Sequence, residues 1–190
     1  NLGDPRAPGA RMMLAEAPMA RREYAIAATH YQRMVIDFPS HPRALEARYR
    51  TCDAYHRLSP QPALDQEYTL SALLHCESVA GNFPGTEEAE QAQQRADELR
   101  LKLAQKVYDT GLFYFRRGAF DSAVVYFDAV LQQYPDSPLA PAALGQLVDA
   151  YTRIGYLEDA EEARERLLTE YPQSEEAQAL RASAEAEPRL

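Results

Sequence analysis

The chain has 190 residues, of which 46% are hydrophobic and 26% are charged, and this composition excludes a disordered protein. Acidic residues (29) outnumber Lys and Arg (20), so the formal net charge is −9 and a nucleic-acid-binding protein is not expected. No apolar run reaches the roughly 18 residues that a membrane span needs. Glycine (8) is scarce and proline (13) is plentiful, which favours helices separated by prolines.

The first 20 residues are rich in Pro and Gly and carry no apolar stripe. We therefore expect residues 1–20 to be irregular or to be the remnant of an interrupted repeat, and residues 21–38 to form the first helix. The sequence begins with Asn1 rather than Met, which indicates a processed or truncated product whose targeting signal would lie upstream.

Residues 21–100 are predicted to hold the N-terminal repeats of a helical array. Residues 42–57 fit the first helix of one unit, and its partner helix carries Ala72 at a position for a small residue. The two helices are separated by a proline-containing insertion at residues 58–69, which begins with "LSPQPALDQEY". This insertion makes the front half of the chain less regular than the back half.

Residues 86–117 are predicted to form one long helix. The segment contains no proline, its single glycine is Gly111, and small or apolar residues keep a helical stripe throughout. At 1.5 Å per residue such a helix is roughly 45–48 Å long. It exceeds one repeat, so we expect the front and back halves of the chain to share it.

Residues 101–190 are predicted to hold two regular tetratricopeptide repeats and a terminal helix. In the first of them, Gly111 and Ala123 let two antiparallel helices approach, Phe127 fills the wedge between them, Gly118 forms the turn and Pro135 ends the unit. The next copy keeps a small residue, a glycine and a proline at the same offsets, with Arg164 at the position of Phe127.

An aromatic residue followed by proline closes each of four units. The four copies are Phe38-Pro39, Phe83-Pro84, Tyr134-Pro135 and Tyr171-Pro172, with proline spacings of 45, 51 and 37 residues. Periods of this size are typical of helical solenoids. The predicted fold is therefore all-α: a tetratricopeptide-repeat solenoid of antiparallel helix pairs with one long connecting helix.

Catalytic and cofactor motifs are missing from the sequence. There is no glycine-rich phosphate loop, no His-Glu-x-x-His pair and no Cys-x-x-Cys, so we expect neither an enzyme nor a bound metal or cofactor. Cys52 and Cys76 fall on positions that face the helix–helix interface, where cysteine acts as a small hydrophobic residue. A disulfide between them is the alternative in an oxidising compartment, although we do not expect the two positions to be directly opposed.

The remaining candidate is a protein-binding surface on the first helices of the repeats. Tyr108 and Phe115 on the long helix, with Asp149 on a later one, take positions that line the concave side of such a solenoid, as Tyr49, Asp53 and His56 do further forward. Arg116 and Arg153 lie at equivalent helix ends, and aromatic residues beside arginine are common at protein interfaces. The alternative is that Tyr108, Leu112 and Phe115 only pack against neighbouring units.

The order of these segments resembles the BamD family, the repeat-containing subunits of the outer-membrane β-barrel assembly machine. The resemblance covers residues 21–175 and is carried by "FPSHPRALEARYRTCDAYHRL", the insertion, "GNFPGTEEAEQAQQRADELRLKLA" and "YFRRGAFDSAVVYFDAVLQQYPDSPLAPAALGQLVDAYTRIG". The family has five repeats, so the chain would hold the last three and part of the second.

The resemblance implies a non-catalytic scaffold at the periplasmic face of the bacterial outer membrane. Its C-terminal repeats would bind the periplasmic domain of BamA, in a complex with other subunits of the machine, and its N-terminal repeats would face unfolded barrel substrates. Membrane association would need a lipid anchor upstream of this fragment. A basic residue that relatives use to contact BamA falls on Tyr126, so Tyr126 is a candidate contact without the salt bridge.

A related periplasmic coordinator of the peptidoglycan and Tol systems is the alternative identity, because its repeats share the phrase "YPDSPLAPAAL". That protein has regular repeat spacing and an N-terminal coiled coil. The 51-residue spacing and the long helix disfavour it.

Overall fold

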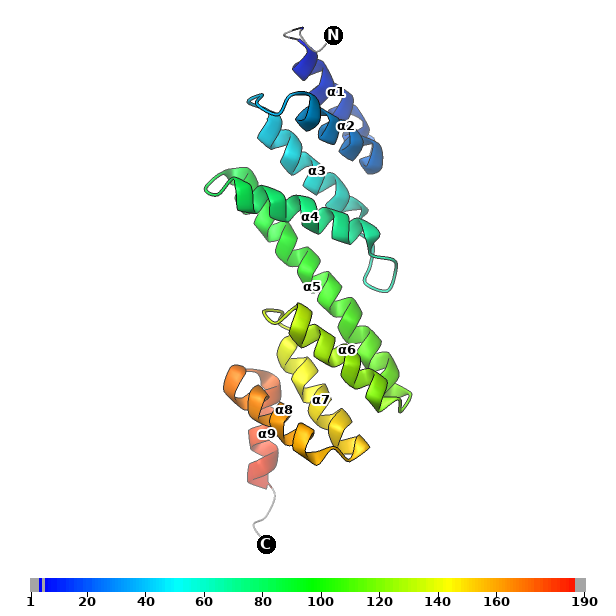
Figure 1. The fold of residues 1–190 in the computed structure, drawn as a ribbon, viewed down its shortest axis with the longest axis vertical. Coiled ribbons are helices and arrows are strands. Elements are labelled where there is room, and N and C mark those ends of the chain that lie inside the picture. The colour runs from blue at the N-terminus through cyan, green and yellow to red at the C-terminus, as the bar shows by residue number, and fades with distance from the viewer. Residues whose placement is uncertain (1–3, 5, 187–190) are drawn as a thin grey trace. The chain divides into compact units, whose positions relative to one another are not determined.

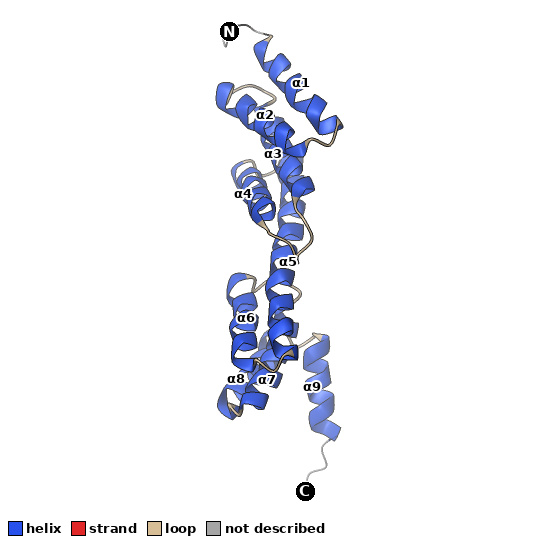
Figure 2. Cartoon of the chain, turned by 90° about the vertical axis from the view of Figure 1, so that its right-hand side faces the viewer, coloured by secondary structure: helices blue, strands red, loops and turns tan. Residues whose placement is uncertain are grey.

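The computed structural model describes residue 4 and residues 6–186, and these residues form helices and loops without a strand (Figure 2). The predicted segments 1–20 and 101–190 include residues 1–3, 5 and 187–190, which lie outside the described residues. The helices labelled in Figure 1 are α1 (Ala7–Ala20), α2 (Tyr24–Asp37), α3 (Ala44–Leu58), α4 (Glu67–Asn82), α5 (Glu87–Arg116), α6 (Phe120–Gln133), α7 (Ala140–Ile154), α8 (Leu157–Glu170) and α9 (Glu175–Ala186).

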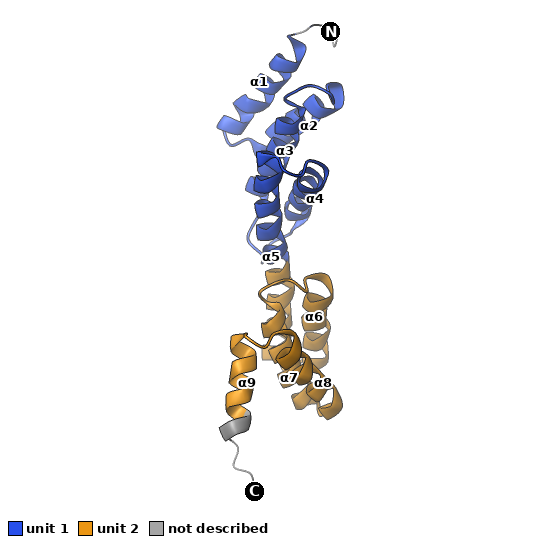
Figure 3. Cartoon of the chain, turned by 90° about the vertical axis from the view of Figure 1, so that its left-hand side faces the viewer, with its two compact units in different colours: residues 1–103 blue, residues 104–190 orange. Residues whose placement is uncertain are grey.

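The chain divides into two compact units, unit 1 at residues 1–103 and unit 2 at residues 104–190 (Figure 3). In unit 1, α1 packs on α2, α2 on α3 and α3 on α4. In unit 2, α6 packs on α7, α7 on α8, and α9 lies against both α7 and α8. Helices that follow one another along the chain thus pack together, which is the predicted all-α arrangement of a tetratricopeptide-type solenoid.

The aromatic–proline phrases mark the ends of α2, α4, α6 and α8. Each helix ends one residue before its aromatic residue, and the backbone N–H of that residue donates to the carbonyl four positions earlier. The proline that follows has no N–H with which to extend the helix. The four aromatic residues are Phe38, Phe83, Tyr134 and Tyr171.

Helix α1 occupies residues that the sequence predicted to be irregular or to be the remnant of an interrupted repeat, and the helix is at odds with the irregular alternative. Met12 and Ala15 of α1 are fully buried in one cluster with Ala27 and Tyr31 of α2. The sequence pattern misled because Pro18 lies inside the helix, where proline removes a backbone hydrogen bond. Pro18 lies in the last turn, so the loss is confined to the helix end while the packing of α1 on α2 remains.

A disulfide joins Cys52 of α3 to Cys76 of α4, with the two Cα atoms 4.9 Å apart and both side chains fully buried. The expectation that these positions are not directly opposed is therefore wrong. The equivalent positions of the next repeat show why, because a Cβ on Gly111 would lie only 2.6 Å from Cε1 of Phe127. The two positions face each other in both repeats, as a small–large pair in one and as two bonded cysteines in the other.

Side-chain hydrogen bonds hold the insertion between α3 and α4. The buried Gln66 donates through Nε2 to the carbonyl oxygens of Gln61 and Leu64, each at 2.9 Å. Its Oε1 accepts a hydrogen bond from Oγ1 of Thr69 at 2.6 Å, and Thr69 also bonds Ser59 at 2.7 Å. These contacts tie the insertion to the first turn of α4.

Helix α5 has 30 residues and runs from unit 1 into unit 2, where the sequence predicted a helix over residues 86–117. Three glutamates, Glu87, Glu88 and Glu90, lie in its first turn, and Arg116 lies in its last. Charges in these places favour the helix through its dipole. The small residues Ala92 and Ala96 are buried in the unit 1 core together with residues of α3 and α4, whereas a Cβ on Gly111 would meet Phe127 of α6 in unit 2.

Candidate protein-binding surface

Arg153, near the end of α7, lies over two aromatic rings of unit 2. Its guanidinium carbon is 5.4 Å from the ring centroid of Phe115 and 5.5 Å from that of Phe120. The two rings meet edge to face, with centroids 5.2 Å apart. Stacking of this kind holds the guanidinium plane while leaving its N–H groups open to a partner. Arg153 itself is exposed to solvent.

Phe115, which lies under this exposed arginine, and Tyr108 both pack against the unit 2 core. Both rings contact Phe127, at centroid distances of 6.5 and 5.6 Å, and Phe127 is fully buried. Burial, followed by the charges of Glu176 and Asp109, raises the pKa of the Tyr108 phenol above its usual value. Tyr108, Leu112 and Phe115 all pack against the unit 2 core, so they support the surface and are not free side chains on it.

Four arginines of unit 2, namely Arg116, Arg117, Arg153 and Arg181, have no carboxylate partner among the described residues. Arg181 donates instead to the carbonyl oxygen of Pro172 at 2.9 Å, whereas the arginines of α8 pair with neighbouring glutamates. Arg117 lies 4.3 Å from the ring centroid of Phe113, which is 44% exposed. We call Arg116, Arg117 and Arg153, together with Phe115 and Phe120, the arginine–aromatic end of unit 2.

The structure separates the other two candidates from this group. Tyr126 stacks on Tyr114 with ring centroids 5.3 Å apart and planes at 10°, and Tyr114 meets Phe113 edge to face. Tyr126 therefore belongs to a row of aromatic residues on α5 and α6. Asp149 is exposed on α7, and it forms no ion pair with Arg153, four residues later on the same helix.

The candidates named from the sequence did not include Phe120 and Arg117. A usable signal existed for Arg117, which follows Phe113 by four residues and so shares its helix face. Phe120 gave none, because its contact with Arg153 joins the first residue of α6 to α7.

The forward positions Tyr49, Asp53 and His56 converge on Arg95 of α5 within unit 1. Asp53 is 1% exposed, its Oδ1 lies 2.6 Å from an Arg95 nitrogen, and its Oδ2 accepts a hydrogen bond from Nε of Arg57 at 3.0 Å. Burial, followed by the charge of Arg95, lowers the pKa of His56. These side chains join α3 to α5 as a buried polar cluster, so Tyr49 and Asp53 do not form an open binding face.

The described residues form neither a metal site nor a membrane-spanning helix. Across residues 6–186 and residue 4, no group of three or more His, Cys, Asp or Glu side chains is arranged to hold a metal ion. None of the helices in that part of the chain is both long enough and apolar enough to cross a membrane.

The repeat architecture can be compared with known proteins. The model of the YfiO family, described as outer membrane lipoprotein, matches residues 2–167. The chain belongs to this family. A curated relative from Caulobacter vibrioides, named outer membrane protein assembly factor BamD, is 30% identical over 149 residues, which is 78% of this chain and 49% of the relative.

Further relatives carry the same name. The protein from Rickettsia prowazekii is 25% identical over 172 residues, 90% of this chain and 68% of the relative. The protein from Xylella fastidiosa strain Temecula1 is 34% identical over 95 residues, 50% of this chain and 32% of the relative. The resemblance to the BamD family is thus confirmed, and the chain spans about half the length of the Caulobacter relative.

A crystal structure of MamA protein aligns with 97% of the chain at 16% identity, with a TM-score of 0.32. This alignment is too loose to bear on the fold or the function.

Proposed function

We propose that the chain is a non-catalytic protein-interaction scaffold in outer-membrane protein assembly, at the periplasmic face of the bacterial outer membrane. Its partner is the periplasmic region of BamA, together with other subunits of the same assembly machine. The docking surface is the arginine–aromatic end of unit 2. That the N-terminal repeats bind unfolded barrel substrates stays a prediction.

Family membership supports the general role. The relatives are named assembly factors of outer membrane proteins and not enzymes. Tetratricopeptide-type helix pairs present continuous side-chain surfaces to other proteins. A role in binding therefore fits both the family and the fold.

The observation that carries the docking surface is the exposed guanidinium of Arg153, held on Phe115 and Phe120. Residues 104–190 carry 15 acidic and 8 basic side chains, so unpaired arginines stand out in an acidic unit. Arginine fixed on aromatic rings, with its N–H groups unpaired, is suited to bidentate contacts with a partner carboxylate. It also loses little side-chain entropy on binding, because the rings already restrain it.

The test is the affinity of the full chain for the purified BamA periplasmic region. Replacing Arg116 and Arg153 together by alanine should raise Kd by about tenfold or more, the effect expected from removing a charged contact at the centre of an interface. Phe115→Ala is less suitable, because Phe115 packs against the core and its loss would also reduce stability.

The control is Arg50→Ala, which removes an exposed arginine of unit 1 that has no carboxylate partner in the described part of the chain. Kd should stay unchanged in this variant. Equal affinity of the Arg116/Arg153 variant and the wild type would refute the docking surface, and absence of any BamA binding by the wild-type chain would refute the partner.

A further inference from the structure

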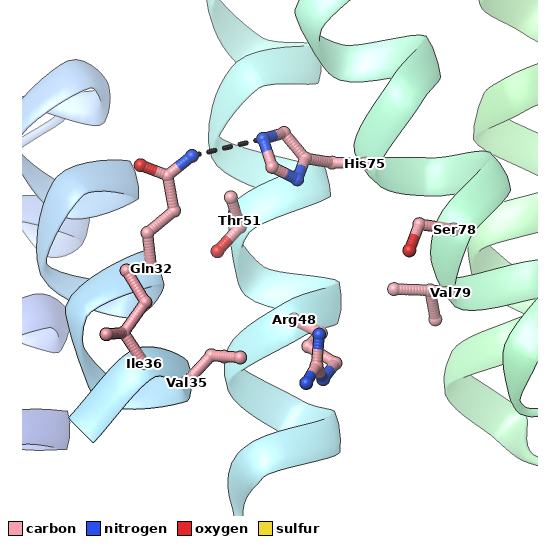
Figure 4. Close-up of a pocket in the computed structure, with 8 residues that line it drawn as sticks. All are labelled: Gln32, Val35, Ile36, Arg48, Thr51, His75, Ser78 and Val79. Atoms are coloured by element: carbon pink, nitrogen blue, oxygen red, sulfur yellow. Dashed lines mark hydrogen bonds between the residues drawn. The ribbon is translucent and has the colours of Figure 1, made fainter. Parts of the chain in front are cut away.

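Unit 1 contains a groove between α2 and α4, floored by α3, with a volume of about 390 Å³ (Figure 4). Its size lies at the lower end of the range of about 300–1,000 Å³ typical of ligand sites. It has room for a few side chains of a bound segment and not for the face of a whole helix. The proposed docking of unit 2 uses none of its residues.

Apolar side chains lie on both sides of the groove, and those of α2 are open to solvent, whereas Val79 of α4 is buried. Val35 and Ile36 of α2 face Val79 of α4 across it (Figure 4). The side chain of Ile36 is 73% exposed, and Leu74, four residues before the lining residue Ser78 on α4, is 66% exposed. Branched apolar side chains at this exposure gain free energy when a partner covers them.

Among the described residues that line the groove, Arg48, on the floor, alone carries a full charge. Its guanidinium carbon lies 5.8 Å from the ring centroid of Phe83, and it has no carboxylate partner in the described part of the chain. Ser78 faces the same space. Its Oγ accepts a hydrogen bond from Nδ2 of Asn82 at 3.3 Å and keeps its own hydrogen for a ligand. The unused donors of the groove therefore suit a negatively charged acceptor.

One end of the groove is closed by two side chains that already satisfy each other. Nε2 of Gln32 lies 3.0 Å from Nε2 of His75 and bridges α2 to α4 (Figure 4). His75 also stacks on Tyr55, with ring centroids 5.3 Å apart. Because burial lowers the pKa of His75, this end adds no cation at neutral pH. The positive charge of Arg48 is thus the feature that selects a ligand.

We propose that this groove binds an extended segment of a protein partner that carries an acidic side chain next to an aliphatic one. The carboxylate lies between Arg48 and Ser78, and the aliphatic side chain packs on Val35 and Ile36, beside the buried Val79. The carboxylate comes from a side chain within the segment, because a chain terminus entering the closed end would meet Gln32 and His75, which are already bonded.

The test uses fluorescein-labelled, N-acetylated and C-amidated octapeptides that alternate glutamate with valine or isoleucine, titrated with the full chain and read by fluorescence anisotropy. The glutamate peptide should show saturable binding. Arg48→Gln should weaken it by about tenfold, because the charged hydrogen bonds are lost. Ile36→Ser should also weaken it, and this change of an exposed residue leaves the core intact.

Arg50→Gln is the matched control, since it removes the same charge from α3 outside the groove. It should leave the affinity unchanged, as should the Arg116/Arg153 variant of unit 2, so a failure here is separable from a failure of BamA docking. A second peptide has glutamine in place of glutamate and a free terminal carboxylate. It should bind about tenfold more weakly than the glutamate peptide.

Three results would each overturn the proposal. They are no saturable binding of the glutamate peptide, equal binding of the glutamine peptide, and equal loss of affinity in Arg48→Gln and Arg50→Gln. Circular dichroism shows whether Arg48→Gln keeps its helicity. If helicity is lost, the affinity of Ile36→Ser for the glutamate peptide is the deciding measurement.

Discussion

Arg22, in the turn between α1 and α2, has a φ of +62° and is the only described non-glycine residue with a positive φ. It occupies the place that Gly118 takes between α5 and α6, where φ is +75°. The left-handed conformation brings the Cβ of an L-residue close to the following carbonyl, and glycine avoids this contact. The turn between α1 and α2 thus has the same backbone conformation as the turn between α5 and α6, but it carries an arginine where glycine would be less strained.

Arg22→Gly should therefore stabilise unit 1. The relief of left-handed strain is about 1 kcal/mol, reduced by the greater freedom of glycine in the unfolded chain, so we expect a net gain of about 0.5 kcal/mol. Urea unfolding followed by circular dichroism measures it. Gly118→Ala is the reverse control and should destabilise the protein, whereas a lower midpoint for Arg22→Gly would contradict the account.

Sequence reasoning at the residue scale found part of the candidate surface. Phe115 and Arg153 were both named, and the structure brings them into contact. The sequence could not show that Phe115 also reaches Phe127, because helical periodicity places a residue on a face without saying how deep its neighbours lie. The sequence left the disulfide between Cys52 and Cys76 as an alternative, because the repeat register gives positions along the chain and does not show which of them oppose each other across a helix pair.

The packing of α5 against α6 depends on one close contact, between Gly111 and Phe127. Because Gly111 has no side chain, α6 can come close to α5. A Cβ at this position would lie only 2.6 Å from Cε1 of Phe127. Gly145 of α7 offers a comparison, because a Cβ there would meet only Cγ of Glu176, at 3.6 Å. The same residue type thus has two different roles in neighbouring helices.

Gly111→Ala should cost about 1–2 kcal/mol of unfolding free energy, since the clash with Phe127 outweighs the better helix propensity of alanine. Gly145→Ala should instead be neutral or stabilising by up to about 1 kcal/mol. Thermal unfolding of both variants beside the wild type gives the comparison. Equal shifts for the two variants would show that the contact with Phe127 does not matter.

The ends of α2, α4, α6 and α8 could be predicted from the aromatic–proline phrases, because proline has no backbone N–H with which to continue a helix. Helix α1 could not be predicted in this way, because Pro18 and Arg22 replace residues that the repeat pattern requires. Packing of Met12 and Ala15 against α2 overrides those local preferences. Tertiary contacts of that kind leave little trace in a single sequence.

The whole molecule consists of two compact units that hold their cores by different means. Unit 1 contains the disulfide and the buried Asp53 beside Arg95 and Arg57. The core of unit 2 is a continuous apolar cluster around Phe127 and Leu144. Conditions that reduce the disulfide should therefore destabilise unit 1 and leave the stability of unit 2 unchanged.

Reduction of the disulfide should lower the unfolding free energy of unit 1 by about 2–4 kcal/mol, because the bond closes a loop of sequence separation 24. Hydrogen exchange with and without dithiothreitol measures the effect. Amides of α3 and α4 should lose protection, while those of α6 and α7 keep theirs. Equal loss in both units would contradict their independence.

The disulfide has a consequence for how this repeat can change over time. At the positions of Cys52 and Cys76, the neighbouring repeats hold Gly111 with Phe127 and Ala15 with Tyr31. If only one of the two cysteines is replaced by a small residue, the other remains as a buried thiol. Neither glycine at position 52 beside Cys76 nor alanine at position 76 beside Cys52 fills the space between α3 and α4. We therefore expect substitutions at the two positions to occur together, because a single one leaves the space between the helices unfilled.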